Sequence, residues 1–262
     1  MIRALRTAST GMQAQQRQVE TIANNIANVN TTGFKKNRLA FRSLLYQTYK
    51  APGSNVAKDQ IDPTGLQVGT GAEVSSSTKS FQQGDLVPTG GAFDIAIKGE
   101  GFLAINGPSG ETLYTRDGAL RKDAEGRLVT ADGYRLASEI TIPPDALAVV
   151  IGNDGTVTYA TAQSPTGSTA GQITLTRFAN PAGLDARGDN FYAETASSGT
   201  PTEATPGDTG TGTIKHGYLE RSNVQVVDEL IELIQAQRNY ELNSRTIKVG
   251  DEMMQQVNQM IR

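Results

Sequence analysis

The sequence has no cysteine, no tryptophan and a single histidine, His216. Without cysteine, the chain can form neither disulfide bonds nor thiolate metal sites. A Ser-His-Asp triad would have to use His216, but there is no Gly-x-Ser-x-Gly turn, and "IKHGYLE" at residues 214–220 is typical of a strand edge. The His-Glu-x-x-His, EF-hand and Walker patterns are also missing. We therefore expect no enzyme activity, no metal site and no cofactor.

Long apolar runs are missing as well. No stretch of eighteen apolar residues occurs, which excludes a helical membrane span. The N-terminus has neither the apolar segment of a signal peptide nor a cleavage motif. We expect a chain that does not insert into a membrane and that carries no cleaved signal peptide.

Positive charge is concentrated near the N-terminus. Residues 1–42 hold seven Lys or Arg and one acid, a net charge of +6, whereas the whole 262-residue chain carries −3. No aromatic platform interleaves the basic run Lys35, Lys36 and Arg38, so we expect no nucleic-acid binding. The basic region is either a solvated face or a face that meets acidic neighbours, and the sequence favours neither.

Both ends of the chain carry apolar residues with a seven-residue period. Four such positions begin at Leu5 and six begin at Val226, which predicts a coiled-coil helix at each end. The positions that we expect to form an assembly interface are Leu5, Met12, Val19, Ile22, Ile26, Val226, Leu230, Leu233, Tyr240, Ile247, Met254, Val257 and Ile261.

The C-terminal repeat predicts a long helix with a weak second row. It should begin with Ser222 or Asn223 as the N-cap and run to the end of the chain. The companion row of the repeat has one apolar residue and is otherwise polar, and Gly250 in mid-helix costs about 1 kcal/mol relative to alanine. Such a helix should be weak alone and adequate when it packs among copies. The companion positions are Leu230, Gln237, Ser244, Asp251 and Asn258.

The middle of the chain differs in kind. Short alternating or β-branched runs such as "FDIAI", "FLAIN" and "TVTYA" are separated by Asp-Gly and Glu-Gly turns, which predicts an all-β domain. Residues 49–65 and 195–213 lack periodicity and predict an extended arm and a long loop. We therefore expect a multi-part α+β chain. Its parts would be a helix over 1–33, a linker arm over 34–73, the β domain over 74–221, and a second helix over 222–262 that packs on the first.

Three motifs resemble the bacterial flagellar rod and hook family. They are "STGMQAQQRQVETIANNIANVNTTGFK" at 9–35, "DIAIKGEGFLAI" at 94–105, and the segment 219–260, beginning "LERSNVQVVDELIELIQAQRNYE". The chain length and the composition of residues 44–71 favour the distal-rod members. A proximal-rod or hook-type member is the alternative within the family. Outside it, a secreted β-rich enzyme acting on glycans and a module binding membrane surfaces remain open.

The resemblance implies a structural subunit of the flagellar basal body. It implies that copies self-assemble into a rigid helical tube that spans the periplasm and transmits motor torque to the hook. The implied partners are further copies, proximal-rod proteins, the hook protein, the P- and L-ring proteins around the rod, and the flagellar type III export apparatus. Export through that apparatus requires no cleaved signal peptide.

Two local roles follow from the resemblance. The asparagine-rich segment would end the first helix and turn the chain outward, with Asn24, Asn25 and Asn28 bonding helix-end carbonyls and Gly33 supplying a left-handed backbone. An ordinary fraying helix end is the alternative. The arm would dock on adjacent subunits and make the shaft rigid, through Pro52, Val56, Ile61 and Pro63.

Overall fold

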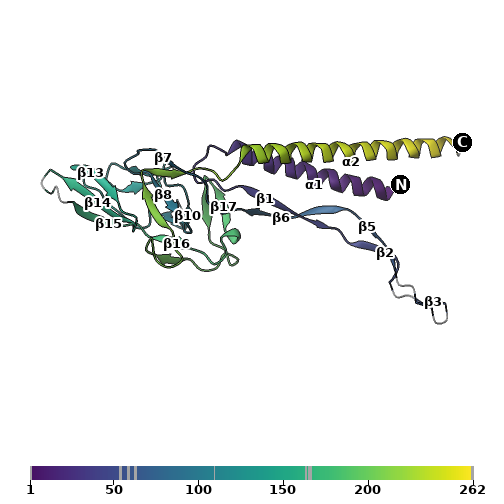
Figure 1. The fold of residues 1–262 in the computed structure, drawn as a ribbon, viewed down its shortest axis with the longest axis horizontal. Coiled ribbons are helices and arrows are strands. Elements are labelled where there is room, and N and C mark those ends of the chain that lie inside the picture. The colour runs from purple at the N-terminus through teal and green to yellow at the C-terminus, as the bar shows by residue number, and fades with distance from the viewer. Residues whose placement is uncertain are drawn as a thin grey trace. The chain divides into compact units, whose positions relative to one another are not determined.

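The computed structural model describes residues 2–52, 55–57, 60–61, 64–108, 110–162, 164 and 167–260. These residues group into two compact units, which we describe separately. The helical unit comprises the described residues of 1–26, 37–78 and 225–262, and the β unit comprises those of 27–36 and 79–224. The α+β organisation expected from the sequence is confirmed, with a helix near each end and a β-rich centre (Figure 1).

The helical unit contains two long helices, α1 (Ile2–Ala27) and α2 (Val226–Met260). Helix α2 has Asp228 and Glu229 in its first turn, where the helix dipole favours negative charge. It begins three residues after the predicted N-cap, Asn223. That side chain is used elsewhere, because its oxygen accepts from the Lys36 backbone N–H at 2.8 Å and its nitrogen donates to the Ser80 carbonyl at 2.8 Å.

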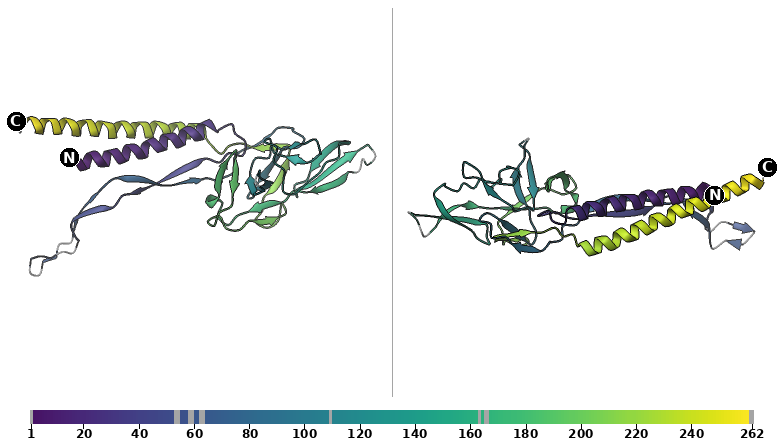
Figure 2. Two further views of the ribbon diagram at one scale, coloured as in Figure 1. Left: turned by 180° about the vertical axis from the view of Figure 1, so that it is seen from behind. Right: turned by 90° about the horizontal axis from the view of Figure 1, so that it is seen from above.

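The two helices lie side by side and run antiparallel (Figure 2). Asn25, near the end of α1, bonds Glu229, near the start of α2, at 3.0 Å. At the opposite end, a Cβ built on Gly250 of α2 would lie 2.7 Å from a methyl carbon of Leu5. These contacts at opposite ends require that the chain directions oppose.

Short strands complete the helical unit. Strand β2 pairs antiparallel with β5, with Tyr46 opposite Gly69, so residues near both ends of the expected arm form paired strands, which the sequence did not predict. Strand β1 pairs with β6, and β3 pairs with β4. The bounds are β1 (Asn37–Ser43), β2 (Tyr46–Lys50), β3 (Asn55–Ala57), β4 (Gln60–Ile61), β5 (Leu66–Gly69) and β6 (Ala72–Lys79).

The β unit is built of short antiparallel pairings. Its largest sheet has the strand order β17-β18-β10-β9, and a three-stranded sheet has the order β13-β14-β15. The bounds are β7 (Leu86–Pro88), β8 (Ile95–Lys98), β9 (Leu103–Asn106), β10 (Thr112–Thr115), β11 (Arg121–Lys122), β12 (Leu128–Val129), β13 (Ala146–Ile151), β14 (Thr156–Thr161), β15 (Ser168–Gln172), β16 (Leu175–Arg177), the short helix η1 (Pro181–Gly183), β17 (Asp185–Gly188), β18 (Phe191–Ala193), β19 (Thr202–Ala204), β20 (Thr213–His216) and β21 (Tyr218–Glu220).

The structure tests the predicted turn at Asp154-Gly155 and the predicted loop over 195–213. The Asp154-Gly155 turn joins β13 to β14, and Gly155 has a φ of +79°, a backbone state that favours glycine. The predicted loop over 195–213 is only partly a loop. It contains β19, which pairs antiparallel with β16 so that Thr176 lies opposite Glu203.

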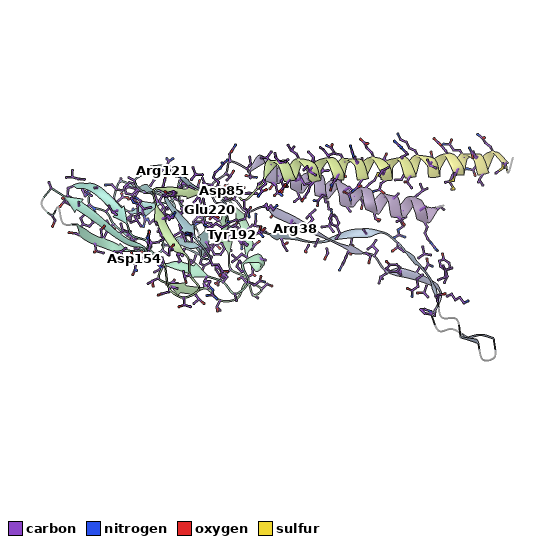
Figure 3. The ribbon with its side chains drawn as sticks, in the orientation of Figure 1. Arg38, Asp85, Arg121, Asp154, Tyr192 and Glu220 are labelled. Atoms are coloured by element: carbon purple, nitrogen blue, oxygen red, sulfur yellow. The ribbon has the colours of Figure 1, made fainter. Side chains whose placement is uncertain are left out.

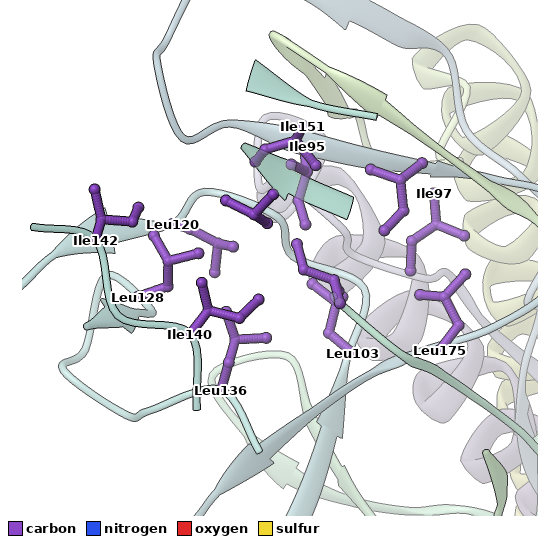
Figure 4. Packing of buried hydrophobic residues seen from close by; sticks show 13 residues of the cluster. Ile95, Ile97, Leu103, Leu120, Leu128, Leu136, Ile140, Ile142, Ile151 and Leu175 are labelled. Carbon is purple, nitrogen blue, oxygen red and sulfur yellow. The ribbon is translucent and has the colours of Figure 1, made fainter. Parts of the chain in front are cut away.

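The hydrophobic core of the β unit lies where several of these small sheets meet (Figure 4). Leu103, Val157, Leu175 and Ile214 are fully buried there, although each comes from a different strand. A second cluster is aromatic, with Phe102, Tyr114, Phe178 and Tyr192 packed edge to face. Pairings too short to be stable alone are thus held by shared burial.

Truncation of the core tests this account. We expect Leu103→Ala to lower the free energy of unfolding of the β unit by about 2–5 kcal/mol, because the side chain is fully buried and its removal leaves a cavity. Leu147→Ala is the matched control, because Leu147 lies in β13 of the same unit and is 76% exposed. Thermal unfolding followed by circular dichroism measures both. Equal destabilisation by the two variants would contradict the assigned core.

Candidate assembly interface

The predicted apolar row of α1 lies on a buried side of the helix. Ile22 is 1% exposed, and the other predicted positions are half-buried. Leu5 approaches Gly250 of α2. In a single chain, this row therefore packs at least partly against the chain's own second helix. The half-buried positions are Leu5, Met12, Val19 and Ile26.

The predicted positions of α2 divide into two groups. Leu233, Ile247, Met254 and Val257 are half-buried. Val226, Leu230 and Tyr240 are exposed, at 39–44%. Ile261 lies outside the described residues. The structure of one chain thus places only some of the predicted positions in the helix pair.

The companion row of α2 was placed one residue too late. Gln237 and Asp251 are exposed, whereas the buried residues are Glu229, Ala236 and Gly250, each one position before an expected companion. A search for apolar periodicity does not find these residues, because they are small or charged. Small residues are what close helix contact requires, as Gly250 shows against Leu5.

A second apolar row lies on another side of α2, and the sequence analysis missed it. Its members are 45–79% exposed, so α2 is apolar on more than one face. Pairs seven residues apart, such as Val227 and Ile234, were a signal in the sequence. This outer row consists of Val227, Ile231, Ile234, Leu242, Val249, Met253 and Met260.

Asn25 of α1 forms hydrogen bonds to two other segments of the helical unit, β1 and α2. Its side chain is 2% exposed and donates to the Asn37 carbonyl at 3.0 Å and to Glu229 Oε2 at 3.0 Å. Its side-chain oxygen accepts from the Asn37 backbone N–H at 2.9 Å. These partners differ from the helix-end carbonyls expected from the sequence. The cause is that Asn25 points to the side of α1, where β1 and α2 begin.

The other junction residues have different surroundings. Asn24 lies exposed on α1, and the side-chain oxygen of Asn28 accepts from the Thr31 hydroxyl at 3.2 Å. Gly33 has a φ of +68°, and its N–H donates to the Glu220 carbonyl at 2.9 Å. A Cβ at Gly33 would lie 2.7 Å from the backbone nitrogen of Asp117. The position therefore needs glycine for both its backbone state and its close packing.

Glu220 is the centre of a buried ionic cluster in the β unit (Figure 3). One carboxylate oxygen accepts from Lys35 Nζ at 2.6 Å and from the Gly84 N–H at 2.9 Å. The other lies 3.3 Å from Arg116 Nε, without the alignment of a hydrogen bond. Lys35 also donates to the Gln82 carbonyl at 2.8 Å. All three charged side chains are at most 3% exposed.

This cluster holds two cations and one carboxylate. Burial lowers the pKa of Lys35, and the nearby Arg116 charge lowers it further, while Glu220 raises it. Burial also raises the pKa of the neighbouring Tyr192, which keeps its hydroxyl neutral. Glu220 therefore supplies the negative charge that offsets the two cations of the cluster. The cluster ties the segment that follows α1 to β21, the last strand before α2.

The proposed rigidity residues are only partly visible. Pro52 is exposed in a turn, and the backbones of Val56 and Ile61 lie in β3 and β4. Pro63 lies outside the described residues.

His216 bonds the Ala92 carbonyl at 2.9 Å through its ring Nε2.

The described part of the chain lacks both a membrane-spanning helix and a metal-binding cluster. No helix there is both long and apolar enough to cross a membrane. No group of three or more histidine, aspartate or glutamate side chains in the described residues is arranged to hold a metal ion.

Family models match three successive parts of the chain. Residues 5–35 match the model of flagella basal body rod proteins, and residues 96–159 match the D1 domain of flagellar hook protein FlgE/F/G. Residues 215–260 match the C-terminal region of flagellar basal body rod FlgEFG proteins. The class is therefore that of the flagellar rod and hook proteins, as the sequence motifs predicted.

Full-length relatives define the family more narrowly. The chain is 44% identical to the flagellar basal-body rod protein FlgG of Buchnera aphidicola subsp. Schizaphis graminum over 260 residues, 99% of this chain and 100% of the relative. It is 46% identical to FlgG of Caulobacter vibrioides over 99% of each chain, and 40% identical to FlgG of Bacillus subtilis over 98% of each. The chain belongs to the FlgG family of flagellar basal-body rod proteins. It is a structural protein of the flagellar basal body and not an enzyme.

The charge imbalance of the Glu220 cluster generates a prediction. We expect Glu220→Gln to cost about 3–5 kcal/mol of unfolding free energy, because it leaves two buried cations without a carboxylate. Lys35→Met leaves one cation with one carboxylate and should cost clearly less. Denaturant unfolding of the β unit, followed by tyrosine fluorescence, compares the two. The assignment fails if Lys35→Met is the more damaging change.

Proposed function

We propose that this chain is the subunit of the distal rod of the flagellum. Copies would self-assemble into a rigid helical tube that spans the periplasm and transmits motor torque to the hook. The family membership supports this, as do the length and the arm of the chain. The remaining partners that we propose are proximal-rod proteins, the hook protein, the P- and L-ring proteins, and the type III apparatus that exports the chain without a cleaved signal peptide.

We propose that each part of the chain expected from the sequence has its own structural role. Helices 1–33 and 222–262 would pair as a coiled coil, the segment 34–73 would act as the linker arm, and residues 74–221 would form the outer β domain. The asparagine-rich junction and Gly33 would set the direction in which the chain leaves the first helix. Contacts within the helical unit and within the β unit support this division.

The outer row of α2 is the observation that carries self-assembly. It presents seven large apolar side chains to solvent along a helix whose other apolar row already packs on α1. Several large exposed apolar side chains on one side of a helix, as here, indicate an interaction site. Copies that meet through unlike surfaces and do not close into a ring form an open helical polymer, which is what a shaft requires.

A charge in the outer row should stop assembly. We expect Ile234→Asp to abolish polymer formation, because a carboxylate would be buried without a partner between copies. The monomer should keep its fold, since Ile234 is 51% exposed in the single chain. Gln237→Asp, on an exposed polar side of the same helix, is the control and should assemble normally. Sedimentation measures assembly, and circular dichroism checks the fold. A normally assembling Ile234→Asp protein would refute this interface.

The arm should determine stiffness. We expect a chain that lacks residues 47–65 to assemble, because both helices remain, but to form curved polymers, because side chains such as Val56 would no longer fill gaps between subunits. A Gly/Ser segment of equal length is the control for the missing mass and should also give curved polymers. Electron micrographs measure curvature. Deletion polymers as straight as those of the wild type would remove rigidity from the arm.

A further inference from the structure

The two ends of the helix pair are chemically unlike. Because α1 and α2 run antiparallel, the start of α2 lies beside Asn25, whereas the start of α1 lies beside Gly250. The outer row follows α2 between these ends. Its first half therefore lies at one end of the helix pair and its second half at the other.

The first half of the outer row is acidic. Residues 226–232 hold three carboxylates and no cation. Asp228 and Glu232 are exposed, and they flank Val227 and Ile231, which are 69% and 50% exposed. The helix dipole favours Asp228 in the first turn, and Glu232 accepts a hydrogen bond from Gln18 of α1 at 3.4 Å. This end of α2 is an apolar ridge with one negative side.

The second half of the outer row borders an apolar groove that contains one charged residue, Arg245. The groove has a volume of about 320 Å³ and is lined by Leu5, Leu242, Arg245, Val249, Gly250 and Met253. Leu5 and Gly250, which pack closely on one another, both line it. Ala4 of α1 also lines the groove, and α1 has no acid before Glu20. Lys248, Asp251 and Glu252 also lie at this end of α2, and their charges sum to −1.

We propose that the acidic start of α2 in one copy docks into this groove of a second copy. Val227 and Ile231 fill the groove, and Asp228 meets Arg245. Opposite charges and matching apolar surfaces select the second copy of this chain as the occupant. The inference rests on the proposed self-assembly and adds which two surfaces meet, namely the ridge of one copy and the groove of another.

Charge exchange within one chain tests the pairing. We expect Asp228→Arg and Arg245→Asp each to raise the critical concentration for assembly at least about tenfold, because like charges then face one another across the contact. The double variant Asp228→Arg, Arg245→Asp restores opposite charges and should assemble within about threefold of the wild type. Asp228→Asn is the control for the helix dipole and should have a smaller effect than Asp228→Arg. Sedimentation of the full-length chain measures each value, and circular dichroism checks the fold.

Two further measurements sharpen the test. In about 1 M NaCl the differences between the wild type and the single variants should shrink, because the Debye length falls to about 3 Å. Fluorescently labelled double variant should not add to wild-type polymers, because each new contact between the two chains pairs like charges.

The outcomes separate the pairing from self-assembly itself. A double variant no better than the worse single variant overturns the pairing, and so do single variants that assemble normally. If Ile234→Asp still abolishes assembly in those cases, the outer row remains an interface and only its partner was misassigned. If the wild type stays monomeric at every concentration, or Ile234→Asp also assembles normally, self-assembly through this row fails as well.

Discussion

The helical unit depends on the buried contact between Asn25 and Glu229. A carboxylate that is 2% exposed must keep its hydrogen bonds, because a buried charge that loses them is costly. If α1 slid along α2 by one heptad, Glu229 would lose Asn25 while both rows would still offer apolar partners. The apolar repeats alone permit several registers, and this polar contact selects one of them. Through Asn37, the same side chain also fixes where the first strand leaves α1.

Once the register is fixed, the two apolar sides of α2 have separate uses. The inner side carries small residues such as Ala236 and Gly250, which let α1 approach closely. The outer side carries large side chains such as Ile234 and Leu242, which remain exposed in one chain. A helix that buries apolar residues on two opposite sides is suited to a layered assembly, in which each chain supplies one partner and neighbouring copies supply the other.

The sequence predicted the elements of the fold better than their contacts. Heptad spacing identified both helices, and Asp-Gly turns such as Asp154-Gly155 located hairpins, because both signals are local. The Glu220 cluster could not be predicted, since Lys35, Arg116 and Glu220 are far apart in the chain and only the folded β unit brings them together. The companion row was misplaced because periodicity was judged by apolarity. The residue that sets the register is charged.

Arginine within the outer row limits the strength of any single contact. Arg238 and Arg245 stand at row positions that a permanent two-helix contact would fill with apolar side chains, and each must be desolvated or paired when copies meet. One such contact is therefore weaker than an unbroken apolar row. In the proposed polymer each copy makes this contact twice, once through its ridge and once through its groove, so the two free energies combine. A subunit built in this way remains separate while it is dilute and is held firmly once it lies among neighbours.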